Sequence, residues 1–206
     1  MTPHDVNAYL TWLIAAIMGR LQEADGIASQ HGASIYRVAA ALQKSNRQPL
    51  RRLYRGILLE PHEIKVGGVV DPQMGVQSVS FTEDRDVACY FGLPDTIMSG
   101  FVKQQRPLVE GYLAEHMPQR SEILWHYRWN PITVKNRSID VRTAARSHPL
   151  VADPFQFDFV FDTQKEVIVK PLIAPLSVTP IADTCPDPRE LDRRFTPPHI
   201  YGAFSP

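Results

Sequence analysis

Apolar residues recur at three- and four-residue steps along the first fifty residues, which is the spacing of one face of an α-helix. The pattern predicts a first helix that starts at Pro3 behind a Thr2 cap and ends near Gly26. It predicts a second helix from about Ser34 that ends before Pro49. The residues expected to face inward are Val6, Leu10, Leu13, Ile14, Ile17 and Leu21 in the first helix, and Ile35, Val38, Ala39 and Leu42 in the second.

From residue 53 the pattern changes to short β-rich runs that are separated by turn residues. One short helix, residues 83–91, is expected among them, with Thr82 as its cap and Gly92 at its end. Such runs are typical of a mixed or antiparallel sheet in an α+β protein, and not of regular βαβ repeats. The predicted strands are Leu53–Leu59, Val76–Phe81, Leu108–Ala114, Ile123–Trp129, Ser138–Arg142, Phe157–Phe161 and Val167–Ile173.

The composition divides the chain of 206 residues into three segments. Residues 1–50 are helical, residues 51–171 form the core, and residues 172–206 are rich in proline. Eight of the 18 prolines lie between Pro171 and Pro206, so this last segment is expected to form no continuous β-ladder and to wrap the surface or stay mobile.

Charge, cysteine content and hydropathy exclude several classes of protein. Lys plus Arg and Asp plus Glu each number 22, so no overall field attracts nucleic acid or an anionic membrane. Cys89 and Cys185 are too few for a disulfide framework and lack the spacing of metal ligands, so we expect no metal site. The longest apolar run, residues 10–18, is too short to cross a bilayer. The simplest location is the cytoplasm.

Three polar residues stand in or beside apolar strands. Arg55 lies inside the first predicted strand, and Gly56 after it allows close approach of another backbone or a ligand. Ser80 belongs to a row of hydroxyls on one face of the second strand. Glu166 shares a predicted strand face with Gln164. Each has an ordinary explanation when taken alone: an arginine paired at a sheet edge, a strand facing solvent, or polar residues where a strand starts.

Taken in order, the three motifs resemble those of the Arg-Ser-Glu class of ADP-ribosyltransferases, the group related to the clostridial and cholera-type toxins. Leu53-Tyr54-Arg55-Gly56 is similar to the arginine motif, and Ser80-Phe81-Thr82 is similar to the Ser-Thr-Ser motif, with Phe81 and Thr82 as departures from it. Gln164-Lys165-Glu166 resembles the third motif, Gln/Glu-x-Glu before a hydrophobic strand. The resemblance covers roughly residues 51–171 and implies a split mixed or antiparallel β-sandwich.

The resemblance implies a chemical role for each of these residues. NAD would be the substrate, and cleavage of its nicotinamide–ribose bond creates an oxocarbenium-like centre that an anion stabilises. Glu166 would supply that anion, and Ser80 would hold its carboxylate by a hydrogen bond. Arg55 would bind the pyrophosphate. Gly56 would offer its backbone to the nicotinamide amide, and Phe91 or Phe101 would stack on the nicotinamide ring.

Gln164 bears on the acceptor of ADP-ribose. Relatives that modify arginine usually carry Glu at this position, whereas those with Gln modify asparagine, glutamine or a nucleobase. The segment Phe155–Phe161 would include the target-recognition loop of the family. Its four phenylalanines also fit an alternating strand with all four rings inward.

Three functions follow from the sequence. The first is a mono-ADP-ribosyltransferase that modifies a protein side chain, with asparagine or glutamine favoured over arginine, as a toxin, an effector or a phage-encoded enzyme would; it would work in the cytoplasm, including that of a host cell. The second has a nucleic acid as acceptor, since residues 101–150 hold eight basic against four acidic residues. The third is an inactive scaffold that serves as a binding module.

Overall fold

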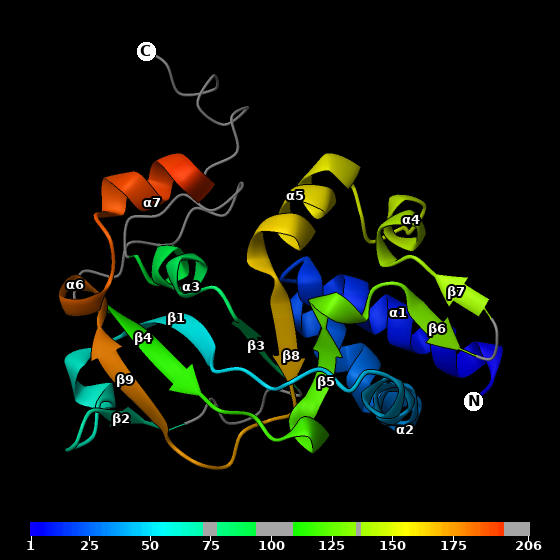
Figure 1. Ribbon diagram of the computed structural model, residues 1–206, viewed down its shortest axis with the longest axis horizontal. Coiled ribbons are helices and arrows are strands. Elements are labelled where there is room, and N and C mark those ends of the chain that lie inside the picture. The colour runs from blue at the N-terminus through cyan, green and yellow to red at the C-terminus, as the bar shows by residue number, and fades with distance from the viewer. Residues whose placement is uncertain (72–77, 94–108, 135–136, 196–206) are drawn as a thin grey trace. The chain divides into compact units, whose positions relative to one another are not determined.

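The computed structural model describes residues 1–71, 78–93, 109–134 and 137–195 (Figure 1). Two N-terminal helices precede a seven-strand antiparallel sheet with helices interspersed, so the predicted α+β class is confirmed. The chain forms two compact units. The first comprises Met1–Arg51, Gln73–Ser80 and Pro118–Leu172, and the second comprises Arg52–Pro72, Phe81–Met117 and Ile173–Pro206.

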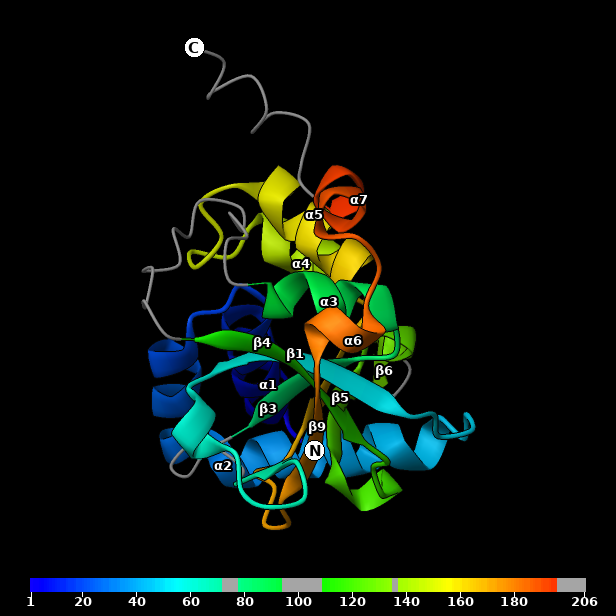
Figure 2. The same cartoon turned by 90° about the vertical axis from the view of Figure 1, so that its left-hand side faces the viewer.

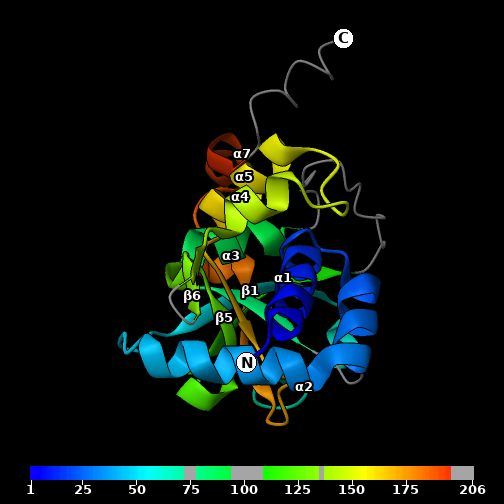
Figure 3. The same ribbon diagram turned by 90° about the vertical axis from the view of Figure 1, so that its right-hand side faces the viewer.

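The first unit begins with two packed helices, α1 (Pro3–Ile17) and α2 (Leu21–Ser45), which Figure 3 shows side by side. The break between them falls at Gly19, whose φ of 68° ends α1, earlier than the predicted end near Gly26. Inside α2, His31 has non-helical dihedral angles (φ −124°, ψ 19°), and this kink lies three residues before Ser34, where the second helix was expected to begin. The exposed side chain of Leu21 also contradicts its expected inward position. The other residues that form the buried faces are largely those that the periodicity predicts.

The start of α1 is fixed by a reciprocal pair of hydrogen bonds between Thr2 and Asp5, which confirms the predicted cap. The Asp5 carboxylate accepts from the Thr2 backbone N–H at 2.7 Å and from the Ser34 hydroxyl of α2 at 2.8 Å. Arg37 lies 3.4 Å from the same carboxylate. A buried acidic side chain therefore joins the first turn of α1 to the middle of α2.

The strands of the first unit are short and buried. β5 (Ile123–His126) pairs antiparallel with β8 (Glu166–Val169), and every residue of both strands is buried. The helices are bonded to β5, because the Tyr9 hydroxyl donates to Leu124 O at 2.7 Å and the Gln43 amide donates to Ile123 O at 2.6 Å. These bonds give the N-terminal helices a structural role in positioning β5.

The remainder of the first unit differs in part from the sequence pattern. The strand predicted at 123–129 ends at His126, because Tyr127–Trp129 forms a 3-10 helix. A hairpin of β6 (Ile132–Val134) and β7 (Arg137–Ile139) follows. Asp140 then caps α4 (Val141–Arg146), so the strand predicted at 138–142 ends at Ile139.

Residues 157–161, predicted as a strand, lie inside a helix, α5 (Pro154–Gln164). Asp153 caps this helix through its side chain, and Pro154 occupies the first turn, where a proline is favoured. Of the four phenylalanines expected to face inward, Phe157 is fully buried but Phe155 is 83% exposed. The alternating pattern therefore predicted the wrong element, although the cap and the proline are visible in the sequence.

The second unit has its strands in the order β2-β9-β4-β1, all antiparallel: β2 (Val69–Val70), β9 (Leu176–Pro180), β4 (Glu110–His116) and β1 (Leu53–Leu59). Tyr54 of β1 also pairs with Thr82 of β3 (Val79–Thr82). β1 has the predicted bounds. The expectation that the proline-rich segment forms no β-ladder was wrong, because this segment contains β9. Residues 176–179 of β9 contain no proline and alternate between buried and exposed positions.

A helix, α3 (Arg85–Gly92), lies across β1 and β4 (Figure 2). Asp84 caps it, and Thr82, the predicted cap, accepts instead from the Asp84 backbone N–H at 3.0 Å. α3 approaches β1 so closely at Gly56 that only glycine fits there, because a Cβ on Gly56 would lie 2.0 Å from Ala88 O. The expectation that another backbone comes close at Gly56 is confirmed.

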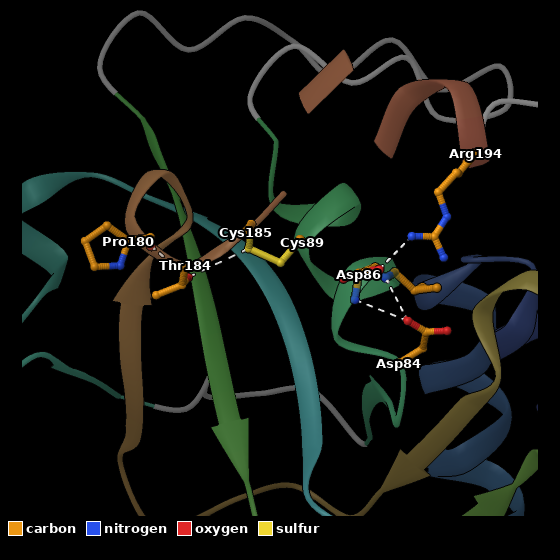
Figure 4. The surroundings of a disulfide bond; sticks show 8 residues. Asp84, Asp86, Cys89, Pro180, Thr184, Cys185 and Arg194 are labelled. Carbon is orange, nitrogen blue, oxygen red and sulfur yellow. Dashed lines mark hydrogen bonds and ion pairs between the residues drawn. A yellow bond between two sulfur atoms is a disulfide. The ribbon is translucent and has the colours of Figure 1, made fainter. Parts of the chain in front are cut away.

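Two C-terminal helices complete the second unit: α6 (Ile181–Thr184) and α7 (Pro188–Phe195). Leu191 and Phe195 of α7 join a buried apolar cluster with Tyr90 and Leu93. Cys89 of α3 forms a disulfide with Cys185, which follows α6 (Figure 4). Within the described ranges, no helix has the length and apolar character that a bilayer span requires.

Candidate active site

Glu166 is the first residue of β8 and is 8% exposed, although its side chain is ionisable. The chain enters β8 directly from the end of α5, as Figure 1 shows. Lys165, the residue between them, adopts the left-handed conformation with φ 45° and ψ 51°, and it is the one non-glycine residue with positive φ in the described part of the chain. Such conformations cost energy and are enriched at functional sites.

The Ser80 hydroxyl of β3 donates a hydrogen bond to Oε1 of Glu166. Both residues belong to the first unit, and they lie 86 positions apart in the sequence. The hydrogen bond that the family resemblance predicts between these two side chains is therefore present. A hydroxyl that donates to a carboxylate oxygen fixes the orientation of the carboxylate.

Gln164 does not share a strand face with Glu166, and this prediction from strict alternation was wrong. Gln164 is the last residue of α5, and the left-handed Lys165 reverses the chain before β8 begins. Gln164 is half-buried. It adjoins Glu166 in the chain, but its direction is set by a helix end and not by the pleat of a strand.

Arg55, Gly56 and Phe91 belong to the second unit. Gly56 faces α3, so by alternation along β1 the half-buried Arg55 points to the opposite face of the strand. Phe91 packs against the apolar cluster of α3 and makes an edge contact with Tyr90. Phe101, the other expected stacking residue, lies outside the described residues.

A group of residues next to Glu166 was missed in the sequence: His126, Tyr127 and Arg128, at the end of β5. His126 pairs with Val167, the residue after Glu166, and the 3-10 helix Tyr127–Trp129 follows, so the group lies at the end of the strand pair where Glu166 begins β8. The Arg128 Nε donates to the Tyr127 hydroxyl at 2.7 Å, and its guanidinium lies over the Tyr127 ring at 5.2 Å. The available signal was a polar sequence, His-Tyr-Arg, directly after an apolar strand.

His126 contacts both of the other residues in this group. It is 6% exposed, its Nδ1 accepts from the Arg128 backbone N–H at 3.2 Å, and its ring stacks on Tyr127 at 4.9 Å. An Nδ1 that accepts belongs to the tautomer with its proton on Nε2. The ring of Trp129 lies 6.2 Å from that of His126, so the aromatic contacts continue into the core.

Comparisons with known proteins give no relative for this arrangement. No family model matches the chain, and no curated protein and no solved structure is significantly similar to it.

Proposed function

We propose that the protein is an NAD-dependent mono-ADP-ribosyltransferase with an ADP-ribosyltransferase-like arrangement of its strands. The observation that supports this most is the hydrogen bond from Ser80 to a buried Glu166, because two of the three motif residues, 86 positions apart, meet in the way the resemblance requires. A buried polar side chain is costly unless its hydrogen-bonding groups are satisfied, and Ser80 supplies one such bond to Glu166.

In the proposed reaction, NAD binds with its nicotinamide ribose at Glu166. The bond between the nicotinamide nitrogen and C1′ of the ribose breaks, and its electron pair leaves with nicotinamide. Glu166 stabilises the positive charge that develops on the ribose, by accepting a hydrogen bond from a ribose hydroxyl. An acceptor nucleophile then bonds to C1′ and loses its proton. Ser80 positions Glu166. The resemblance also implies that Arg55 binds the pyrophosphate and that Gly56 and Phe91 contact nicotinamide; these three residues belong to the second unit.

The acceptor is the other half of the proposal. Gln164 favours an asparagine or glutamine side chain over arginine, with a nucleic-acid base as the second candidate. Incubation of the protein with labelled NAD and a cell lysate, followed by separate treatment of the product with protease and with nuclease, distinguishes these acceptors. Transfer of no label to either class would contradict the transferase assignment.

The catalytic centre is tested before the acceptor is known, by measuring nicotinamide release from NAD. Loss of a positioned electrostatic stabiliser costs on the order of a hundredfold or more in rate, so Glu166→Gln should be slower than wild type by at least that factor. Glu23→Gln is the matched control, because Glu23 pairs with Arg20 on the exposed side of α2. Equal rates for wild type and Glu166→Gln would contradict the proposal and favour an inactive scaffold.

A further inference from the structure

The residues at the end of β5 hold one arginine in a fixed position near the candidate catalytic carboxylate. β5 and β8 run antiparallel, with Trp125 opposite Ile168 and His126 opposite Val167. The exit of β5 and the entry of β8 are therefore at the same end of this strand pair. Arg128 leaves β5 at the end where Glu166 begins β8.

Three contacts fix the conformation of Arg128. Its backbone N–H donates to His126 Nδ1, its Nε donates to the Tyr127 hydroxyl, and its guanidinium lies over the Tyr127 ring. A long side chain normally loses conformational entropy when it binds a ligand, and such contacts remove that cost in advance. They also set the plane of the guanidinium, whose Nη nitrogens form the pair of donors that matches two oxygens of a phosphate.

We propose that Arg128 binds the phosphate on the nicotinamide side of NAD, and that Tyr127 and His126 are positioning residues for its guanidinium. This inference rests on the proposed function. This phosphate is bonded to the ribose that Glu166 would contact, so it would have to be held close to Glu166. Arg128 is a cation that follows β5 at the end of the strand pair where Glu166 begins β8.

The first test separates binding from chemistry by steady-state hydrolysis of NAD. A charge-assisted pair of hydrogen bonds corresponds to roughly 10- to 100-fold in affinity, so Arg128→Gln should raise KM by that factor and leave kcat unchanged. Tyr127→Phe keeps the ring under the guanidinium but removes the bond to Nε, so its KM should rise less. Arg146→Gln is the control, because Arg146 is exposed and pairs with Asp158 of α5.

A structural role for Arg128 gives a different result. In that case Arg128→Gln would lower the unfolding temperature and leave KM unchanged, and this outcome overturns the proposal. Arg128→Lys adds a second check, since it keeps the charge but loses the planar pair of donors. We expect it to have a KM between those of wild type and Arg128→Gln.

The second test uses ADP-ribose, which carries both phosphates but no nicotinamide, and it does not depend on catalysis. Trp129 and Trp125 belong to the same chain of ring contacts as His126, so tryptophan fluorescence should report on binding. We expect ADP-ribose to change the emission of wild type, with the dissociation constant raised roughly 10- to 100-fold in Arg128→Gln.

The two tests distinguish failure of the inference from failure of the proposed function. Hydrolysis of NAD with a KM that Arg128→Gln does not alter would overturn the inference and leave the proposed function in place. Binding of ADP-ribose that depends on Arg128, without hydrolysis of NAD by wild type, would support the site and overturn the proposed activity. Absence of both binding and hydrolysis would overturn both.

Discussion

The disulfide between Cys89 and Cys185 should make a large contribution to the stability of the second unit. It joins the middle of α3 to the residue after α6 across a sequence separation of 96, with a Cα–Cα distance of 5.9 Å (Figure 4). A cross-link of this length restricts the unfolded chain strongly. The chain-entropy model gives about 4.7 kcal/mol for a closed loop of roughly 100 residues, and distortion of the native state would lower that value.

The neighbouring contacts explain why the folded state accommodates this link. α7 packs on α3 through Leu191 and Phe195, and Arg194 pairs with Asp86 at 2.7 Å. These contacts hold the C-terminal helices on α3 whether or not the sulfur atoms are bonded. Reduction should therefore destabilise the fold mainly by giving the unfolded chain more freedom, and not by removing the packing.

The perturbation is chemical reduction of wild type, with the double variant Cys89→Ala/Cys185→Ala as the control. For a chain of this size, about 4.7 kcal/mol corresponds to roughly 10–20 °C in the unfolding temperature. Wild type should lose this amount when a phosphine reductant is added, as followed by circular dichroism. The double variant should melt near reduced wild type and show no response to the reductant.

Two results would refute this reasoning. Titration of denatured, unreduced protein with a thiol reagent should find no free thiol, so two reactive thiols per chain would show that the bond does not form. If reduction changes the unfolding temperature by no more than about a degree or two, the disulfide does not restrict the unfolded chain to the extent that the chain-entropy model requires.

Two further predictions concern stability. The Thr2 backbone N–H and the Ser34 hydroxyl both donate to Asp5, and they hold the pKa of this buried carboxyl well below its usual range. The ionised carboxylate therefore stabilises the folded state fully above the ordinary pKa of about 4, and this stabilisation is lost as the pH falls further. Thermal melts between pH 6 and pH 2.5 should therefore fall more steeply for wild type than for Asp5→Asn, and parallel curves would contradict this. Gly56→Ala should destabilise by about 3 kcal/mol in urea unfolding, because its Cβ would meet a backbone oxygen of α3 at 2.0 Å. Gly26→Ala, whose Cβ meets nothing within 4 Å, should stabilise α2 by about 0.5–1 kcal/mol, and equal effects of the two substitutions would exclude the close approach.

The parts of the fold that follow from local rules were predicted from the sequence. The Thr2 cap, the buried faces of α1 and α2, and the bounds of β1 all depend on residues within one or two turns or on strict alternation. The end of the first helix was wrong because a left-handed glycine, Gly19, lies seven residues before Gly26, and both glycines look alike in a sequence. The expected start of the second helix near Ser34 corresponds to the kink of α2 at His31.

The failures occur where one pattern competes with another. Residues 155–161 alternate phenylalanine with other residues and look like a strand, yet they form α5. Asp158 and Asp162 of this helix pair with Arg146 and Arg142 of α4, and no local pattern predicts a pairing between two helices. The β-propensity of the phenylalanines was overridden by tertiary contacts and by the Asp153 cap.

For the candidate site, the sequence predicted one contact correctly, misplaced one residue and missed one group. The contact between Ser80 and Glu166 was predicted through the motif order, and it is present. The placement of Gln164 on a strand face was wrong, because Lys165 takes a left-handed conformation that few non-glycine residues adopt. The His126, Tyr127 and Arg128 group depends on the register of β5 against β8, which a single sequence does not specify.

The disulfide between Cys89 and Cys185 bears on the compartment in which the protein works. Cytoplasmic thiols are kept reduced, so a chain that remains in the cytoplasm would lack the stabilisation estimated above, whereas a chain that passes through an oxidising compartment would acquire it. Under the proposed function, an enzyme that consumes NAD inside a target cell would meet both conditions in turn. The melting temperature of the reduced protein therefore tests the proposal as well as the stability. A reduced form that stays folded is compatible with the proposed activity in a reducing cytoplasm, and one that unfolds would restrict that activity to the oxidised state.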